Sequence, residues 1–198
     1  MGEIKDAFDE IEIRTPYPSV LNHEGLNRQF SMEISAYPAS PVYYIHSPSE
    51  LREIKHNPKV CVSRMCEEDR IEIAHDVKAG KLDAECMGED GFRKSTCFQD
   101  MIWYILRVDG DIAGYLCAEC GYANIYDIGW LYVEERYRGN GYAAELASWF
   151  SHDIFDSGAI PHYGFAISKE SARVAEKCGY QCSRTQQICR TLKAKTAK

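Results

Sequence analysis

The sequence predicts an α+β fold built on a mixed sheet. From about residue 59 onward, short runs of alternating apolar residues predict strands. The turn Asp109-Gly110 predicts an antiparallel hairpin between two of these strands. Helical periodicity at residues 141–157 and 169–177 then separates the last three strands. The helical connections favour parallel neighbours, and the tight turn favours antiparallel ones. Together they indicate a mixed sheet.

The first part of the chain has a different character. Six of the seven prolines fall within the first 58 residues, where they mark turns and breaks. The pattern there predicts a helix at 21–34, a strand at 42–45 and a short helical turn at 49–55. We interpret residues 1–57 as an N-terminal extension or cap, and residues 58–198 as the main domain.

The main domain begins with a strand at 60–65, followed by a helix at 67–79 with acidic residues in its first turn. Residues 83–100 have no clear period and predict a loop with a short helix. From residue 101 onward the apolar periodicity is strong, and the chain has no internal repeat. This periodicity predicts strands at 101–108, 112–119, 124–133, 161–167 and 181–191, and helices at 141–157 and 169–177.

Composition excludes several classes of protein. The chain has 198 residues, of which 45% are hydrophobic and 27% are charged, which suits one ordinary globular domain, or one such domain with a sizeable appendage. A net charge of -7 argues against a nucleic-acid partner, because such proteins usually carry a basic face. No apolar run approaches the ~18 residues of a membrane span. The N-terminus lacks the basic region and apolar run of a signal peptide, so we expect a cytoplasmic protein.

The nine cysteines follow no disulfide framework. Cys117-Ala-Glu-Cys120 is the only CxxC sequence, and it lies in a predicted strand. Residues three apart on a strand point to opposite faces, so these thiols are badly placed to share one metal ion. We therefore expect reduced packing cysteines and no metal, with a metal or redox module as the remaining alternative.

Residues 133–143 carry the strongest chemical signal. They follow a predicted strand and open a predicted helix. Gly139 and Gly141 allow a sharp turn, and the first N–H groups of the helix have no intrahelical partner. Arg136 and Arg138 add positive charge. This combination predicts an anion site at a helix N-terminus, although it lacks the Gly-Lys-Ser/Thr ending of a P-loop. The alternative is a tight connection without a ligand.

The stretch YVEERYRGNGYAAEL resembles motif A of the GNAT superfamily of acyl-CoA-dependent N-acyltransferases, Gln/Arg-x-x-Gly-x-Gly/Ala. Arg138, Gly141 and Ala143 occupy the three defined positions. A second frame, two residues earlier, also fits. We prefer the first frame because the five-residue spacing from Val133 to Arg138 is usual in that family.

A second resemblance lies downstream, in HYGFAISKESARVAEKCGYQ. This stretch is similar to motif B of the same family, in which a strand and Asn-x-x-Ser precede a helix that ends in Glu-Lys-x-Gly-Phe. The two motifs stand in the expected order, and the resemblance covers roughly residues 60–190. Motif B is kept at Ser171, Glu176, Lys177, Gly179 and Tyr180.

The resemblance implies a GNAT-like sheet that is mostly antiparallel, flanked by helices, and split between two parallel central strands at 124–133 and 161–167. Acetyl-CoA, the implied co-substrate, would lie in this split, and a bulge at Gly129 would help to open it. Backbone N–H groups of residues 131–133 would bind the pantetheine and the thioester carbonyl, and those of residues 138–143 the pyrophosphate. The implied cofactor-binding residues are Leu131, Tyr132, Val133, Arg138, Gly139, Asn140, Gly141, Tyr142, Ala143, Ser168 and Ser171.

The reaction implied is direct attack of a primary amine on the thioester, assisted by a base. Asp127 stands where some family members carry a glutamate base, and its alternative role is a strand aspartate bonded to a neighbouring backbone group or tyrosine. His162, beside the split, is interpreted as a locally bonded strand histidine. Glu134 and Glu135 are expected to form a solvated charge cluster with Arg136.

Two departures from the family pattern affect the expected chemistry. Ala175 stands where many members have a tyrosine acid, and Ser168 replaces the motif asparagine. Tyr142, Tyr163 or water are the candidates to protonate the leaving thiolate. A non-catalytic acyl-CoA-binding sensor or scaffold is therefore the alternative function. The amine acceptor is not identified by the sequence, and a homodimer is an assembly that the sequence allows.

Overall fold

The computed structural model describes residues 12–15, 32–36, 40–82, 101–120, 124–164 and 166–194, and side chains within residues 40–183 of these ranges. The strands are β1 (Glu12–Thr15), β2 (Met32–Ala36), β3 (Ser40–Tyr44), β4 (Val60–Arg64), β5 (Met101–Val108), β6 (Asp111–Cys120), β7 (Ile125–Val133), β8 (Ile160–Tyr163) and β9 (Gln181–Ala194). The α-helices are α2 (Glu67–Lys78), α4 (Tyr142–Asp156) and α5 (Lys169–Cys178), with short 3-10 turns at Pro48–Glu50 and Glu135–Tyr137.

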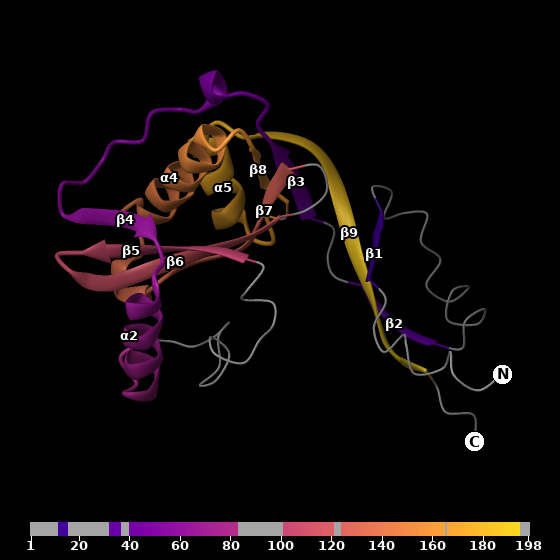
Figure 1. Ribbon diagram of the computed structural model, residues 1–198. Coiled ribbons are helices and arrows are strands. Elements are labelled where there is room, and N and C mark those ends of the chain that lie inside the picture. The colour runs from indigo at the N-terminus through magenta and orange to yellow at the C-terminus, as the bar shows by residue number, and fades with distance from the viewer. Residues whose placement is uncertain are drawn as a thin grey trace.

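The strands form one nine-stranded sheet in the order β1-β9-β3-β8-β7-β6-β5-β4, with β2 also paired to β9 (Figure 1). Each described pairing is antiparallel except the one between β7 and β8. That parallel pairing is short and joins Ile125–Asp127 to Ile160–His162. The predicted α+β fold, with a mostly antiparallel sheet and two parallel central strands, is therefore confirmed.

Helices cover both faces of the sheet. Helices α4 and α5 lie over one face and α2 lies on the other (Figure 1). The larger core joins the apolar stripe of α4, which includes Leu146, Phe150 and Ile154, to the sheet. A second core forms around Ile73 of α2 and Trp103 of β5. No helix in the described ranges has the length and apolar character needed to cross a bilayer.

The N-terminal part of the chain supplies a strand to this sheet. Strand β3, predicted at 42–45, pairs with β8 on one side and with β9 on the other. The short helical turn predicted at 49–55 is smaller than expected, since it ends at Glu50 and Leu51 is already extended. The division of the chain at residue 57 stays a prediction.

The predicted helix at 21–34 is wrong at its C-terminal end. Met32–Ala36 form strand β2, which pairs with β9, and Ile34 lies opposite Thr191. Met32 and Ile34 alternate with polar neighbours as strand residues do, and their pairing with β9 overrides the local helical pattern. The rest of that prediction, and the loop predicted at 83–100, lie outside the described residues.

Strand β8 is shorter than the predicted strand at 161–167. It ends at Tyr163, because the chain then leaves the ladder. The Gly164 N–H is taken by the carboxylate of Asp127, and the Ala166 N–H donates to the Pro41 carbonyl. The bulge predicted at Gly129 is confirmed. Cys117 and Ala118 lie opposite Trp130 and Ile128, which leaves Gly129 as the extra residue of β7.

Candidate functional site

The two parallel strands part after a short contact. Strand β7 continues to Val133, whereas β8 ends at Tyr163, and within the described residues the pairing of the two strands stops at Asp127. A pocket of about 700 Å³ opens there, between the end of β7 and the first turns of α4 and α5. It is lined by Leu131, Tyr132, Val133, Tyr137, Arg138, Gly139, Gly141, Tyr142, Ala143, Ala144, Tyr163, Ser168, Glu170, Ser171, Arg173, Val174 and Lys177.

The turn before α4 presents free backbone donors. Gly141 caps the helix in the left-handed region, with φ of 86°, which a residue with a side chain rarely adopts. Within the described residues, the N–H groups of Gly141, Tyr142 and Ala143 have no protein acceptor. These donors and the positive end of the helix dipole suit an anion.

Cationic side chains surround the same turn. Arg138, Arg173 and Lys177 line the pocket, against one carboxylate, that of Glu170. The Lys177 ammonium lies close to the turn, since a Cβ built on Gly141 would be 3.7 Å from its Nζ. This lining is notable in a chain with a net charge of -7. The pocket is therefore a local positive region suited to phosphate groups.

Arg138 also has a structural role. Its Nε donates to the Val133 carbonyl at 2.9 Å, and its guanidinium lies 5.6 Å from the centre of the Tyr132 ring. The side chain therefore holds the glycine turn against the end of β7. This contact gives a physical reason for the five-residue spacing between Val133 and Arg138.

Asn140 is the one predicted cofactor-binding residue that does not line this pocket. Its side-chain amide donates to the carbonyls of Tyr137 and Arg138, at 3.1 and 3.2 Å. Asn140 therefore closes the turn internally, and it faces a neighbouring hollow beside residues 52–58. The other predicted residues are brought together around the pocket.

A phenol and two serines link the end of β8 to α5. Ser168 caps α5, with its Oγ accepting from the Ser171 N–H at 3.0 Å. The Ser171 hydroxyl lies 3.0 Å from the Tyr163 hydroxyl. Burial raises the pKa of Tyr163 to about 12, although the hydrogen bond to Ser171 acts in the opposite direction. Tyr163 is therefore a protonated phenol at neutral pH.

Ala175, which stands where many members of the resembled family carry a tyrosine, lies in α5 close to Tyr163. Ala175 is fully buried, and Ser171 lies one turn earlier on the same face of α5. The Tyr163 hydroxyl reaches this face from β8. The Tyr142 hydroxyl instead lies 3.5 Å from the Asn57 side-chain amide, on the other side of the turn.

The closed end of the split is held by Asp127. Its Oδ1 accepts from the Gly164 N–H at 2.7 Å and lies 3.1 Å from His162 Nδ1. A Cβ on Gly164 would collide with this carboxylate, so the close approach requires glycine. Asp127 therefore accepts a hydrogen bond from neighbouring backbone, as its alternative role predicts. His162 lies beside Asp127, as expected for a locally bonded strand histidine. His162 Nε2 is buried and, among the described residues, has no hydrogen-bond partner.

The expected charge cluster after β7 is only partly present. Glu135 and Arg136 are exposed, with the Arg136 guanidinium 4.8 Å from the centre of the Tyr137 ring. Glu134 is buried, which corrects the prediction that it is solvated. Its N–H donates to the Ala113 carbonyl at 2.9 Å, so the backbone here still follows the neighbouring strand and carries the side chain inward.

Sequence reasoning missed several lining residues. Tyr137 lies in the motif A segment but was not expected in the pocket. On α5, Glu170, Val174 and Lys177 face the pocket together with Ser171. These positions repeat at helical spacing, so the helical periodicity of motif B was the signal that could have found them.

The cysteine pair does not belong to this site. Cys117 is buried in the core around Ile73, whereas Cys120 is exposed. Over the described ranges, no three His, Cys, Asp or Glu side chains converge as metal ligands would.

The pocket, the bulge and the two motifs agree with a comparison to known families. Residues 64–180, more than half of the chain, match the acetyltransferase (GNAT) family. The chain therefore belongs to this family. A search of curated proteins finds no match.

Solved structures show the same fold. A GCN5-related N-acetyltransferase from Kribbella flavida is 14% identical over 92% of this chain and 67% of its own, with a TM-score of 0.62. A putative GNAT-family acetyltransferase from Novosphingobium aromaticivorans is 18% identical over 93% and 74% of the two chains, with a TM-score of 0.60. A conserved protein of unknown function from Staphylococcus epidermidis is 11% identical over 93% and 73%, with a TM-score of 0.62. At these identities the likeness concerns the fold alone.

Proposed function

We propose that this protein is an N-acetyltransferase that transfers an acetyl group from acetyl-CoA to a primary amine by direct attack. The observation that carries the proposal is the open end of the split between β7 and β8. There a cationic pocket, free N–H groups at the start of α4 and the part of β7 beyond its pairing with β8 meet in one place. An acyl-CoA offers the matching groups, which are phosphates, a polar pantetheine arm and a thioester carbonyl.

In the proposed complex, the pyrophosphate lies against the turn from Arg138 to Ala143. The Lys177 ammonium neutralises part of its charge, because it stands beside Gly141. The pantetheine runs along the edge of β7 from Leu131 to Val133 that faces the pocket, and its amide groups bond this strand in the place that β8 would otherwise occupy. The thioester carbonyl then meets a strand N–H that stabilises the developing oxyanion.

The chemistry requires two proton transfers. The amine nitrogen attacks the thioester carbon and forms the C–N bond, and the C–S bond then breaks. The proton of the amine passes to a base, through water or directly, and the thiolate receives a proton from an acid. The products are an N-acetylated amine and free CoA, so atoms and charges balance.

Asp127 remains the candidate base, now as one member of a pair with His162. The Asp127 carboxylate already accepts from Gly164 and lies beside His162 Nδ1. If Nδ1 donates to Asp127, the lone pair of His162 is on Nε2, the nitrogen without a described partner. Asp127→Asn and His162→Gln test this pair. A base role predicts a lower kcat and an altered pH profile for both, whereas a purely structural role leaves the pH profile unchanged.

Tyr163 is the candidate acid that we favour. Its phenol lines the pocket and meets α5 one turn from Ala175, the position of the family tyrosine. A protonated phenol in this place has a proton to give to the leaving thiolate, and Ser171 can orient it. Tyr142 is less suitable, because its hydroxyl lies near Asn57.

The alternative function is a non-catalytic acyl-CoA sensor, which Ala175 favours. Incubation with acetyl-CoA and a panel of small amines and peptide amines separates the two functions. Free CoA is measured by chromatography, because the nine cysteines of the chain would react with a thiol reagent. Equal amounts of CoA and acetylated amine support the transferase. Binding without amine-dependent release favours the sensor, and absence of acetyl-CoA binding overturns both.

Three further expectations stay predictions. The chain divides into residues 1–57 and a transferase domain at 58–198, it works in the cytoplasm, and it can form a homodimer. Mass measurement of the native protein in solution tests the last of these.

A further inference from the structure

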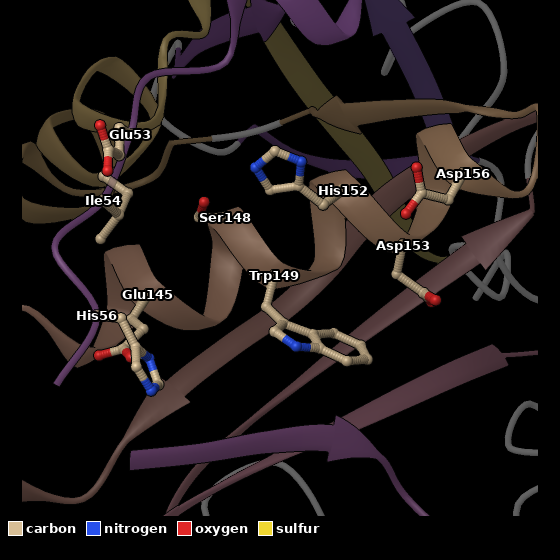
Figure 2. Close-up of a pocket in the computed structure, with 9 residues that line it drawn as sticks. All are labelled: Glu53, Ile54, His56, Glu145, Ser148, Trp149, His152, Asp153 and Asp156. Atoms are coloured by element: carbon tan, nitrogen blue, oxygen red, sulfur yellow. The ribbon is translucent and has the colours of Figure 1, made fainter. Parts of the chain in front are cut away.

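A second pocket lies on the other side of α4. It has a volume of about 380 Å³ and opens between the outer face of the helix and the extended segment at residues 51–57, which we call the strap. Figure 2 shows its lining residues, which come from these two segments alone. They are Glu53, Ile54, His56, Glu145, Ser148, Trp149, His152, Asp153 and Asp156.

The strap is tied to α4 at one end of this groove. The Glu145 carboxylate accepts from the Asn57 N–H at 3.2 Å, and its Oε1 lies 2.6 Å from His56 Nδ1. Arg52 is tied to α5, since its guanidinium donates to the Glu176 carbonyl at 3.1 Å. The groove is therefore a built feature of the fold, fixed on both sides of Glu53.

The groove has a strongly acidic lining. Four of its nine residues are carboxylates, and none is lysine or arginine. Asp153 is satisfied, because it accepts from Arg64 Nε at 2.8 Å and from the Tyr104 hydroxyl at 2.7 Å. Glu53 and Asp156 are different. Within the described residues, neither side chain has an ion-pair or hydrogen-bond partner.

Two acidic residues lie at the C-terminal end of α4, where a negative charge destabilises a helix. Asp153 and Asp156 lie in the last turn of α4, which contains no basic residue. Carboxylates near a helix C-terminus are repelled by the negative end of the helix dipole. Arg64 compensates for Asp153 but not for Asp156. A cation bound in the groove would offset the remaining unfavourable charge.

Ser148 provides a second, independent indication of a ligand. It is only 8% exposed and lies in the floor of the groove between the two acidic ends. Its hydroxyl has no hydrogen-bond partner among the described residues. The hydroxyl oxygen is not among the fully buried polar atoms of the described residues that lack a partner, so it is open to the groove and available to a ligand there. Beside it, the half-exposed Trp149 ring offers a face for a cation.

The distance between the acidic side chains along the groove indicates what shape of cation would fit. The residues from Glu145 to Asp156 extend along about 16 Å of helix, at the usual rise per residue. A single metal ion does not fit this arrangement, because the described carboxylates and imidazoles do not converge. An elongated aliphatic cation can meet the two ends at once and pass Ser148 and Trp149 between them.

We propose that this groove is a second binding site, for a linear aliphatic cation with two or more primary ammonium groups. Ammonium groups would pair with Glu53 and Asp156, and an N–H donor between them would satisfy the Ser148 hydroxyl. The same chemistry occurs in a free polyamine and in lysine side chains of a peptide. The site is separate from the acyl-CoA pocket, so the proposal does not depend on transferase activity.

The experiment measures binding of spermidine to the full chain by calorimetry. We expect one bound molecule, with affinity reduced at least about 10-fold in the double variant Glu53→Gln/Asp156→Asn. A control, Glu67→Gln/Asp109→Asn, makes the same change in net charge at exposed carboxylates away from the groove and should change the affinity by less than about 2-fold. Lack of binding to the wild type, or equal losses in the two doubles, overturns the proposal.

Ser148→Ala provides a second test of the site, with a variant that we expect to fold as stably as the wild type. Because the hydroxyl has no described protein partner, this change should leave the melting temperature of the free protein unaltered and weaken spermidine binding about 3- to 10-fold. Unchanged spermidine affinity in this variant contradicts the assigned contact.

Two further probes identify the source of the ammonium groups. A short peptide with two lysines, tested beside spermidine, supports a peptide ligand if it binds more tightly, and a free polyamine if it binds less tightly. Butylamine, with one ammonium group, should bind at least about 10-fold more weakly than spermidine. Equal affinity for butylamine overturns the requirement for two charged ends.

Discussion

Two pockets lie against helix α4, and their charges are opposite. The pocket at the N-terminus of the helix is lined by three cations and one carboxylate, and it opens into the split of the sheet. The groove on the outer face is lined by four carboxylates and no lysine or arginine. Both pockets border one amphipathic helix whose apolar stripe fills the core, although the cations of the first pocket lie on the preceding turn and on α5.

The difference follows from what each part of a helix can offer. A helix N-terminus supplies free N–H groups and a positive potential without any side chain, so cations around it reinforce an anion site. The outer face supplies only side chains, and acids near its C-terminal end are unfavourable without a partner. The first pocket therefore binds its ligand largely through backbone N–H groups. The second depends on side chains, each of which a single substitution can remove.

The largest effect should come from a carboxylate in the first pocket. Gly141→Asp places a β-carbon and a negative charge at a left-handed position beside the proposed pyrophosphate site. We expect acetyl-CoA affinity to fall about 100-fold or more, measured by calorimetry. Gly158→Asp is the matched control, since Gly158 also has a positive φ of 78° but lies at the other end of α4. Equal affinities in the two variants would refute the assignment of the motif.

The next effect concerns the leaving thiolate. Tyr163→Phe removes the proposed acid and the contact with Ser171, and kcat should fall about 10- to 100-fold. The acetyl-CoA dissociation constant should change little, because the pyrophosphate turn is intact. The pKa of Tyr163 is raised to about 12, so the phenol stays protonated and wild-type activity should not decline through this group between neutral pH and pH ~10. An unchanged kcat in the phenylalanine variant would leave water as the proton donor.

A third change disturbs the closed end of the split. Gly164→Ala brings a methyl group against the Asp127 carboxylate, and the free energy of unfolding should fall by about 1–3 kcal/mol, measured with urea. The double variant Asp127→Ala/Gly164→Ala removes the collision and should recover part of the loss. Acetyl-CoA binding should weaken in Gly164→Ala, whereas spermidine binding should not, because only the first pocket depends on where β7 and β8 part. No recovery in the double variant would contradict the proposed collision.

The smallest effect should come from removal of a single positive charge from the first pocket. Lys177→Gln should weaken acetyl-CoA binding about 5- to 10-fold, through loss of one charge-assisted contact. Lys169→Gln, an exposed position on the same helix outside the pocket, serves as the control. Neither change should affect spermidine affinity by more than about 2-fold. A parallel loss for both ligands would mean that net charge, rather than local contacts, distinguishes the two pockets.

The first pocket could be predicted from the sequence largely because its residues are close together in the chain. The turn from Arg138 to Ala143 and the start of α5 form two short segments with recognisable glycine and serine positions. Strong alternation likewise gave β5 with its observed limits and placed β6 and β7 within one residue at each end. The bulge at Gly129 followed from the expected split of the sheet.

The rest depends on contacts between distant segments. The strap reaches α4 only through the fold, so the groove between Glu53 and Asp156 has no sequence signature. The early end of β8 and the pairing of His162 with Asp127 also arise from tertiary contacts. Strand β2 was missed for the same reason, since its partner β9 is far along the chain.

The most direct test of the central claim is an NMR titration of isotope-labelled protein with acetyl-CoA. If the open end of the split is the binding site, the largest shifts will be those of backbone amides at residues 131–133 and 139–143. Amides of Glu53 and of the outer groove will move much less. Shifts centred on the strap or on α2, or no saturable shifts, would contradict the account.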